Sequence, residues 1–329
     1  MTRRRLYYIG LFAGLCLLPL GLLLLWLWIS FVRADTMKEL RHDFDVDPSG
    51  HLFLFNSKAQ NHDLIFIFDN RSKQFRKLAN TFGSVEEICF LTQKEAVVCI
   101  RTKPNRYSAD VHLYLLDLET GKMRCFASPK AVSGIDIIRI DAKKFMFKRY
   151  QPRVYLTLFG WEIYALVGGD FLADLEHEDI IPVEIATGFY EIEQVLDDTR
   201  KVIISRAIST KGKSWFVAEL DRDIGDPNPQ IKRMQRLPVV TDMLLASDDG
   251  RFCYYVIHNA AINRFDILKM DVNSQHAQVL GSFKHPVKRL RWSRGRLFIL
   301  MEAERPSIWR VGDGREAPQK VFDIFDDRN

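Results

Sequence analysis

The sequence predicts an all-β fold, a β-propeller of about six four-stranded blades, preceded by one N-terminal transmembrane helix. Three observations lead to this prediction. Short apolar runs separated by turn residues recur from about residue 44 onward, and they come in pairs. Each pair is followed by a more polar, alternating strand, as expected for the outermost strand of a blade. Ahead of these repeats lies one long, charge-free apolar stretch. A seventh blade stays open, because the third repeat is irregular.

The N-terminal segment has the features of a membrane anchor. The 27 residues from Leu6 to Val32 carry no charge, and about 20 apolar residues are enough to cross a bilayer. The arginines at positions 3–5 precede the span, which predicts a cytoplasmic N-terminus. We therefore expect residues 1–34 to form a cytoplasmic stub and transmembrane anchor, and residues 35–329 to form one exported domain.

A cleavable signal peptide ending at Ala34 is the alternative to an anchor. The apolar core of a signal peptide runs about 7 to 15 residues, so the length of this stretch favours a retained span. Gly10 and Gly14 form a small-xxx-small pair in the stretch, which would let two spans pack closely. These two glycines are therefore a candidate dimer contact between transmembrane helices.

The charge of the exported part excludes one class of partner. It holds 43 Lys and Arg, the 47 of the chain less the four arginines that flank the span, against 42 Asp and Glu. Such a balance gives no surface-wide attraction for polyanions. We therefore expect no nucleic-acid partner.

Four cysteines lie in the exported part, and they are Cys89, Cys99, Cys125 and Cys253. Cys89 and Cys99 flank a predicted turn at residues 92–95, and a three-residue loop would place them opposite each other across a hairpin. A disulfide is allowed outside the cytoplasm. Buried free thiols that act as small hydrophobes are the alternative, and the sequence leaves both open.

The repeats are clearest at their turns. Asp47-Pro48-Ser49-Gly50 combines a proline-fixed φ with a glycine able to take φ > 0, which predicts a tight hairpin. Similar turns recur at 247–250 and 292–295. Successive units begin near Val46, Ile88, Ile137, Ile192, Met243 and Leu290, so six units fit the spacing of propeller repeats.

A second recurrent element is an apolar strand that ends in Asp, as at 65–69 and 113–117. With these turns, the chain resembles the TolB-like (WD40-like) β-propeller family, and the unit from Lys288 to Phe322 is the closest match. It also resembles the exported half of membrane-anchored winged-helix regulators. Only five residues precede the predicted span, so we expect no DNA-binding domain.

The resemblance implies a closed ring of blades used for binding, with no fixed catalytic residues. It also implies a bacterial inner-membrane protein with a single span, whose propeller lies in the periplasm. Function on such a scaffold depends on the loops at the faces and mouth of the ring.

The sequence contains no clear match to a catalytic, nucleotide-binding or metal-binding motif. Lys211-Gly212-Lys213-Ser214 resembles a phosphate loop, but a β-like segment follows it, so a hairpin turn explains it better. The acidic stretch 170–179 matches no recognised calcium loop and is interpreted as a solvated loop. We find no nucleophile elbow and no His-Glu-x-x-His pattern. We therefore predict no catalytic, cofactor-binding or metal-binding residues, and a protein that is not an enzyme.

Aromatic residues supply the remaining candidates. Trp292 and Trp309 recur at repeat positions, which predicts packing between blades. The irregular third unit holds aromatic and basic residues that could form an exposed partner-binding patch. These residues are Tyr150, Arg153, Tyr155, Phe159 and Trp161.

The leading functional hypothesis is a periplasmic propeller, anchored by one span, that acts as a non-catalytic binding or sensor module for another envelope protein or a small ligand. One alternative is an exported metal-dependent hydrolase or lactonase with its site in the propeller channel. Another is a structural scaffold of an envelope complex.

Overall fold

The computed structural model describes residues 42–58, 62–102, 111–127, 136–158, 161–183, 190–209, 212–226, 229–303, 305–312 and 316–324. For residues 127, 149–168 and 209 it describes the backbone alone. The described residues belong to the second of two compact units, His42–Asn329.

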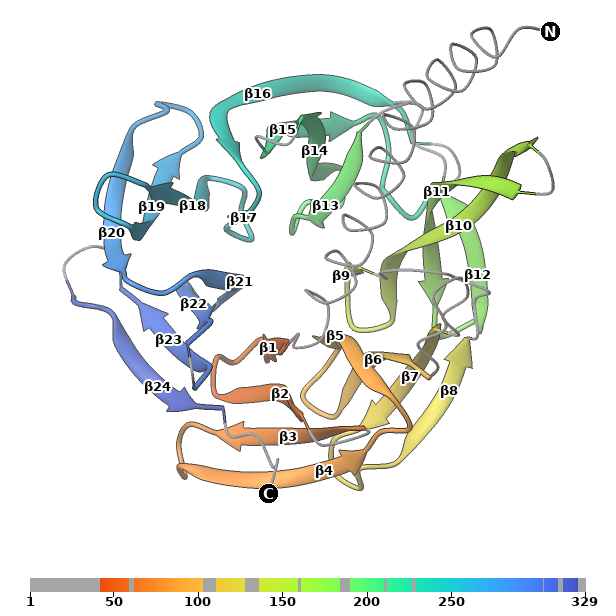
Figure 1. Ribbon diagram of the computed structural model, residues 1–329, viewed down its shortest axis with the longest axis horizontal. Helices are drawn as coiled ribbons and strands as arrows, with labels where there is room; N and C mark the ends of the chain where they lie inside the picture. The colour runs from red at the N-terminus through yellow and green to blue at the C-terminus, as the bar shows by residue number, and fades with distance from the viewer. Residues whose placement is uncertain are drawn as a thin grey trace, which may run out of the picture. The chain divides into compact units, whose positions relative to one another are not determined.

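Six four-stranded antiparallel sheets form the blades of a propeller, and each is built from four consecutive strands. The blades follow one another around a ring in chain order (Figure 1). Their bounds are as follows: blade 1, β1 (Phe44–Val46), β2 (Leu52–Lys58), β3 (Asp63–Asp69) and β4 (Gln74–Asn80); blade 2, β5 (Ser84–Phe90), β6 (Glu95–Arg101), β7 (Val111–Asp117) and β8 (Met123–Ala127); blade 3, β9 (Ile137–Arg139), β10 (Lys144–Leu158), β11 (Trp161–Asp174) and β12 (Asp179–Val183). The remaining bounds are: blade 4, β13 (Glu191–Val195), β14 (Lys201–Ser209), β15 (Gly212–Leu220) and β16 (Ile231–Thr241); blade 5, β17 (Leu244–Ala246), β18 (Phe252–Asn259), β19 (Arg264–Asp271) and β20 (Ala277–Phe283); blade 6, β21 (Val287–Ser293), β22 (Arg296–Met301), β23 (Ser307–Val311) and β24 (Gln319–Asp323).

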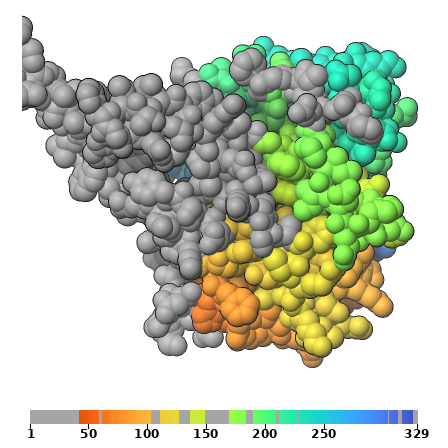
Figure 2. All heavy atoms as spheres, turned by 90° about the vertical axis from the view of Figure 1, so that its right-hand side faces the viewer, coloured from red at the N-terminus to blue at the C-terminus, as the bar shows by residue number. Residues whose placement is uncertain are grey.

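The position of a strand in its blade explains its composition. The second and third strands lie between neighbouring sheets and are almost continuously buried, as in β2 and β3. The fourth strand faces solvent, and in β4 the first four residues are exposed. The space-filling view shows blades 2 to 4 following one another along the rim, from yellow through green to teal (Figure 2). The burial of β2 and β3 and the exposure of β4 confirm the predicted ordering of two apolar strands followed by a polar one.

The antiparallel order gives the propeller two distinct faces. The turns that join the first strand of a blade to the second, and the third to the fourth, lie on one side, which we call the turn face. The hairpins that join second to third strands, and the links between blades, lie on the other side, the hairpin face. The described chain enters β1 from the hairpin face, where the Asn56 side-chain oxygen accepts a hydrogen bond from the Asp43 N–H at 2.7 Å.

The turn after β1 has the predicted geometry. The Asp47 carboxylate accepts hydrogen bonds from the N–H groups of Ser49, His51 and Leu52 at 2.7–3.0 Å. Gly50 takes φ +71°, which a residue with a Cβ rarely adopts. This geometry sets the register in which Val46 faces Phe53.

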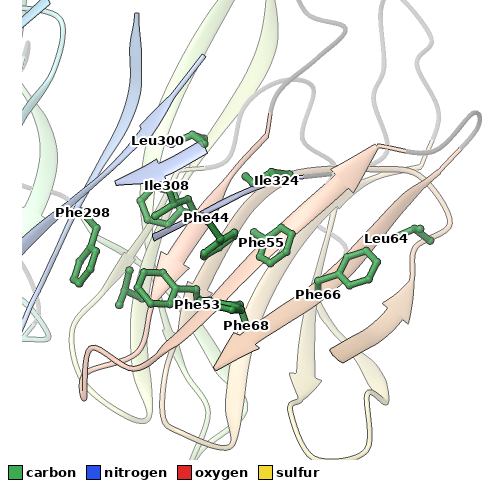
Figure 3. Packing of buried hydrophobic residues seen from close by; sticks show 12 residues of the cluster. Phe44, Phe53, Phe55, Leu64, Phe66, Phe68, Phe298, Leu300, Ile308 and Ile324 are labelled. Atoms are coloured by element: carbon green, nitrogen blue, oxygen red, sulfur yellow. The ribbon is translucent and has the colours of Figure 1, made fainter. Parts of the chain in front are cut away.

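Six hydrophobic clusters fill the six junctions between neighbouring blades. The last one joins blade 6 to blade 1, and its aromatic rings interlock across the junction (Figure 3). The ring of Phe53 lies edge-on to that of Phe298, with centroids 5.1 Å apart, and Phe322 packs on Phe55 at the same distance. In the described ranges no sheet takes strands from both ends of the chain. Among the residues that the structure describes, this ring is therefore closed by side chains rather than by a shared strand.

The irregular third repeat is a complete blade with an extended hairpin. β10 pairs with β9 only at Phe145–Phe147, and β11 pairs with β12 only from Asp170 onward. Beyond those points β10 and β11 pair with each other alone, as far as Leu158 opposite Trp161. The paired ends of β10 and β11 extend outward from the ring of blades in Figure 1. The described sheets therefore give six blades, and the sequence irregularity is a strand extension rather than a seventh blade.

The predicted transmembrane span, Leu6 to Val32, lies outside the described residues, as do Gly10 and Gly14. Within the described ranges, no helix is long and apolar enough to cross a membrane.

Candidate functional site

A cluster of five charged side chains lies where the innermost strands of blades 6, 1 and 2 meet. Arg289 Nε lies 2.9 Å from Asp43 Oδ1, and the same guanidinium reaches Glu87 Oε1 at 2.5 Å. Arg291 Nε lies 3.1 Å from Asp45 Oδ1. We call these five residues the ring-closing cluster, because they join the last blade to the first two.

The carboxylates of the ring-closing cluster also hold the next blade by its backbone. Each accepts a hydrogen bond from a backbone N–H on the innermost strand of the next blade. The pairs are Asp43 with Ile88 at 2.8 Å, Asp45 with Phe90 at 2.7 Å, and Glu87 with Ile137 at 3.0 Å. Burial raises the pKa of Glu87, and the neighbouring Arg289 charge opposes that rise. Every carboxylate of the cluster forms an ion pair with an arginine and accepts a hydrogen bond from a backbone N–H. We therefore interpret the role of this cluster as structural.

A second charged network joins blades 3 and 4. Lys213 Nζ lies 2.7 Å from Glu193 Oε1, which also accepts a hydrogen bond from Ser205 at 2.5 Å. The buried Lys148 ammonium lies 3.8 Å from the other Glu193 oxygen. Ser205 is fully buried, so its hydroxyl is enclosed in the network rather than presented to a substrate.

Asp170 lies opposite Lys148 in the register of β10 and β11. Burial raises the pKa of the Asp170 carboxyl to about 6, although the Lys148 charge pulls it down. Asp170 thus titrates closer to neutrality than an ordinary carboxyl group.

A cavity of about 390 Å³ opens between blades 5 and 6 on the turn face. This volume is within the range of small-ligand sites. It takes residues from three blades: Asp197 from blade 4; Ser247, Asp248, Asp249, Phe252, Tyr254 and Lys269 from blade 5; and Trp292, Gly295, Leu297, Val311 and Gly312 from blade 6. We refer to it as the turn-face cavity.

Aromatic side chains form one wall of the turn-face cavity. The rings of Tyr254 and Trp292 stack with centroids 4.8 Å apart and an interplanar angle of 27°. On another part of the lining, Lys269 Nζ lies 4.0 Å from the centroid of the Phe252 ring. The cavity lining therefore combines two stacked aromatic rings with one cation that already contacts a third ring.

Two of the three cavity carboxylates make no salt bridge among the described residues. Asp249 is engaged, since its carboxylate accepts hydrogen bonds from the Ser247 hydroxyl at 2.6 Å and the Arg251 N–H at 3.0 Å. No ion pair within the described ranges involves Asp197 or Asp248. Their backbones touch, because the Asp197 N–H donates to the Asp248 carbonyl oxygen at 3.0 Å.

The charge of Asp197 acts on the Asp248 carboxyl group. Burial raises the pKa of Asp248, and the nearby Asp197 charge raises it further, while Arg139 and a hydrogen bond with Trp292 oppose the rise. A positively charged group placed between these carboxylates would relieve their repulsion. The turn-face cavity is therefore suited to a basic group that also contacts an aromatic face.

The two tryptophans occupy the predicted positions. Trp292 packs on Tyr254 across the junction of blades 5 and 6, and Trp309 lies edge-on to Phe283 with centroids 5.9 Å apart. Packing between blades is thus confirmed for both. The sequence did not reveal that Trp292 also lines a cavity, because Asp197 joins it there from another repeat.

The disulfide alternative for Cys89 and Cys99 is wrong. Both thiols are free and buried in the junction of blades 2 and 3. In the observed register Cys89 lies opposite Val97 and Cys99 lies opposite Glu87, with a bulge between Val85 and Glu87. The turn at 92–95 therefore sets a register in which the two cysteines are not cross-strand partners. The buried-thiol interpretation is the one that the structure supports.

The predicted partner-binding residues belong to the extended hairpin of blade 3. The backbones of Tyr150, Arg153 and Tyr155 lie on β10, and that of Trp161 begins β11. Phe159 and the side chains of the other four lie outside the described residues. The patch therefore stays a prediction.

The acidic stretch of blade 3 forms the end of β11, a turn and the start of β12. Cations accompany its carboxylates: Lys143 lies 2.9 Å from Glu176, and Arg124 lies 3.0 Å from Glu178. In the described part of the chain, no group of three or more His, Cys, Asp or Glu residues is arranged to hold a metal ion. The alternative of a metal-dependent hydrolase or lactonase stays a prediction.

Comparisons with known proteins agree with the architecture. No family model and no curated protein matches the sequence. Among solved structures, the chain is similar to TolB from Acinetobacter baumannii, with a TM-score of 0.58 and 14% identity over 82% of this chain and 63% of that one. This chain has the TolB-like propeller fold. It is also similar to a putative TolB from Agrobacterium tumefaciens, with a TM-score of 0.54 and 12% identity over 81% of this chain and 90% of that one.

A second group of solved structures similar to this chain comes from proteases and peptidases. The β-propeller domain of the Trilobed protease from Pyrococcus furiosus is similar, with a TM-score of 0.52 and 11% identity over 86% of this chain and 81% of that one. The chain spans less than two thirds of the length of the first TolB structure. The resemblance to membrane-anchored winged-helix regulators is not shown by these structures and stays a prediction.

The prediction that the chain is not an enzyme must be corrected. It rested on the missing catalytic motifs and on a fold used for binding, yet chains of several peptidases carry this same propeller fold. A TolB-like propeller is thus compatible with either role, and the fold gives no ground for excluding catalysis.

Proposed function

We propose that this TolB-like propeller is an exported binding module, anchored in the inner membrane by one N-terminal span, that recognises a basic segment of another envelope protein at its turn face. The observation that carries the proposal is the turn-face cavity. It brings the carboxylates of Asp197 and Asp248, which make no salt bridge in the described ranges, into one lining with the stacked rings of Tyr254 and Trp292.

The chemistry of this lining favours a guanidinium or an ammonium group. A cation gains from the two carboxylates, and stacking on an aromatic face contributes about 0.5–2 kcal/mol more. A guanidinium fits best, because it is planar and can donate to two carboxylates while lying on the Trp292 ring. The membrane and export parts of the proposal are supported by the charge-free segment from Leu6 to Val32 and the arginines that precede it.

The test uses the full chain in lipid nanodiscs and two matched probes. One is a blocked Gly-Arg-Gly tripeptide, and the other replaces arginine with citrulline, which has nearly the same shape but no charge. Binding is measured by calorimetry and by the fluorescence change of the tryptophans. We expect the arginine peptide to bind at least tenfold more tightly than the citrulline peptide.

Substitutions assign that binding to the cavity. Asp197→Asn and Asp248→Asn should each weaken binding of the arginine peptide about tenfold, since each removes one ionic contact worth about 1.4 kcal/mol. Asp198→Asn is the matched control, because Asp198 lies on the same turn but pairs with Arg200. Equal binding of the two peptides, or equal effects of all three substitutions, would refute a basic ligand at this cavity.

A further inference from the structure

We propose that the turn-face cavity binds a basic residue at the C-terminus of a partner chain, with the free α-carboxylate of that residue paired to Lys269. This inference rests on the proposed function, which assigns the basic side chain to the carboxylates of Asp197 and Asp248. It adds a cationic end to the same site, and so specifies which basic residue of a partner the cavity can recognise.

Lys269 is a half-buried cation in largely apolar surroundings. Among the described residues its ammonium group makes no salt bridge, and it lies 4.0 Å from the centroid of the Phe252 ring. Lys269 pairs with Tyr254 across β18 and β19, and blade 6 contributes the buried side chains of Leu297 and Val311 to the same cavity lining. A cation that lacks a hydrogen-bond acceptor in such a place costs free energy, which a bound anion would recover.

The carboxylates that line the cavity do not fill this role. Asp249 is held by its own turn, where its carboxylate accepts a hydrogen bond from the Arg251 N–H at 3.0 Å. In the described part of the chain no salt bridge joins Asp197 or Asp248 to Lys269, although all three line one cavity. The cavity therefore holds opposite charges that are too far apart to pair with each other. A ligand with a cation at one end and an anion at the other can pair with both.

The spacing of the two charged ends suits a single basic residue. Asp248 lies in the turn between the first and second strands of blade 5, and Lys269 lies on the third strand. Neighbouring strands lie about 4.8 Å apart, so the two ends are separated by roughly 5 to 10 Å across the sheet. In an extended arginine, six bonds join the carboxylate carbon to the guanidinium carbon, which is about 7 Å at standard bond lengths. An arginine side chain bound at Asp248 would therefore place its own α-carboxylate within reach of Lys269.

Only the last residue of a chain carries a free α-carboxylate. Inside a chain the same group is an uncharged amide, which gives Lys269 no ionic partner. The apolar side chains of Leu297 and Val311 suit the methylene stem that separates the two charges of the ligand. Free arginine carries both charges as well, but its α-ammonium group would lie close to Lys269 and repel it. A chain end therefore fits the cavity better than the free amino acid.

The test compares three probes by calorimetry on the full chain in lipid nanodiscs. They are acetyl-Gly-Gly-Arg with a free C-terminus, the same peptide with a C-terminal amide, and free arginine. We expect the free acid to bind about tenfold more tightly than the amide, because it adds one charge-assisted contact. Free arginine should bind more weakly than the free acid. Equal binding of acid and amide, or tighter binding of free arginine, would overturn the proposal of a chain end.

Variants assign the preference to one side chain. Lys269→Met removes the charge and keeps an apolar stem, so it should abolish the preference for the acid without weakening the binding of the amide. Arg251→Met is the matched control, because Arg251 lies 4.9 Å from the same Phe252 ring but pairs with Asp271 and lies outside the cavity lining. A preference that survives in Lys269→Met would refute the pairing. Equal loss of acid and amide binding in that variant would give Lys269 a structural role and would refute it too.

A peptide acid that ends in citrulline separates this inference from the proposed function. Arginine acid and arginine amide that bind equally well, both more tightly than the citrulline acid, would refute only the carboxylate contact. Arginine and citrulline acids that bind equally well, with binding lost in Lys269→Met, would refute recognition of a basic group and leave the contact at Lys269 standing. Absence of binding by every probe would refute both.

Discussion

Arg289 Nε and Asp43 Oδ1 lie 2.9 Å apart although 246 residues separate them in the chain. This contact joins the last blade to the first. Because the described sheets share no strand across this junction, the ring depends on such side-chain contacts and on the phenylalanines beneath them. The Ser293 hydroxyl adds a hydrogen bond to the Asp47 carbonyl oxygen at 2.7 Å in the same junction.

Replacing Arg289 should destabilise the propeller strongly. Arg289→Met would leave the carboxylates of Asp43 and Glu87, each only 5% exposed, without their nearest cation. We expect the free energy of unfolding to fall by about 3 kcal/mol, measured by urea denaturation. Lys288→Met is the control, because its pair with Glu302 is roughly half exposed and should contribute under about 1 kcal/mol. Similar losses in both variants would contradict the role of the ring-closing cluster.

The aromatic junction should be equally sensitive to truncation. Phe53 is fully buried and packs against Phe298 and Phe322. Phe53→Ala should therefore cost about 3–5 kcal/mol, since it removes buried area and leaves a cavity. Phe75→Ala, at a ring that is 42% exposed, should cost clearly less. Equal shifts of the thermal midpoint would argue against a closed junction at these residues.

Asp170 should give the protein a measurable pH dependence. Its pKa in the folded state, about 6, lies above the ordinary aspartate value of 3.8. Between those values the folded state binds more protons than the unfolded state, so the free energy of unfolding should decrease as pH rises from about 4 to about 6. Asp170→Asn should remove this slope, worth about 2 kcal/mol across the window. An unchanged slope in the variant would assign the pH dependence to other groups.

The thiols should differ sharply in reactivity. Cys89, Cys99 and Cys253 are buried, and burial raises the pKa of Cys253 to about 12, whereas Cys125 is exposed. Because the thiolate is the reactive form, we expect brief alkylation of the folded protein to modify Cys125 and to spare the other three. Mass spectrometry would locate the label. Modification of Cys89 or Cys99 only after reduction would instead indicate a disulfide.

The sequence predicted the repeat because propeller blades are built from local signals. The Asp47–Gly50 turn, the paired apolar strands and the polar outer strand each depend on neighbours within one unit, so they appear in the residue order. The structure confirmed these features, and blade 3 differs only by the length of its hairpin. The register that separates Cys89 from Cys99 is set by the loop between Phe90 and Ala96, whose length the sequence pattern did not predict correctly.

The sequence by itself therefore determined the all-β class, the approximate number of blades and the position of a charge-free apolar segment. Only the tertiary structure decided how the ring closes and where a ligand could bind. Arg289 contacts Asp43 because ring closure makes the last blade a neighbour of the first. Asp197 and Trp292 line one cavity because turns of blades 4, 5 and 6 come together on the turn face. Contacts of that kind are set by packing across blade junctions, so they have no periodic signature within a single repeat.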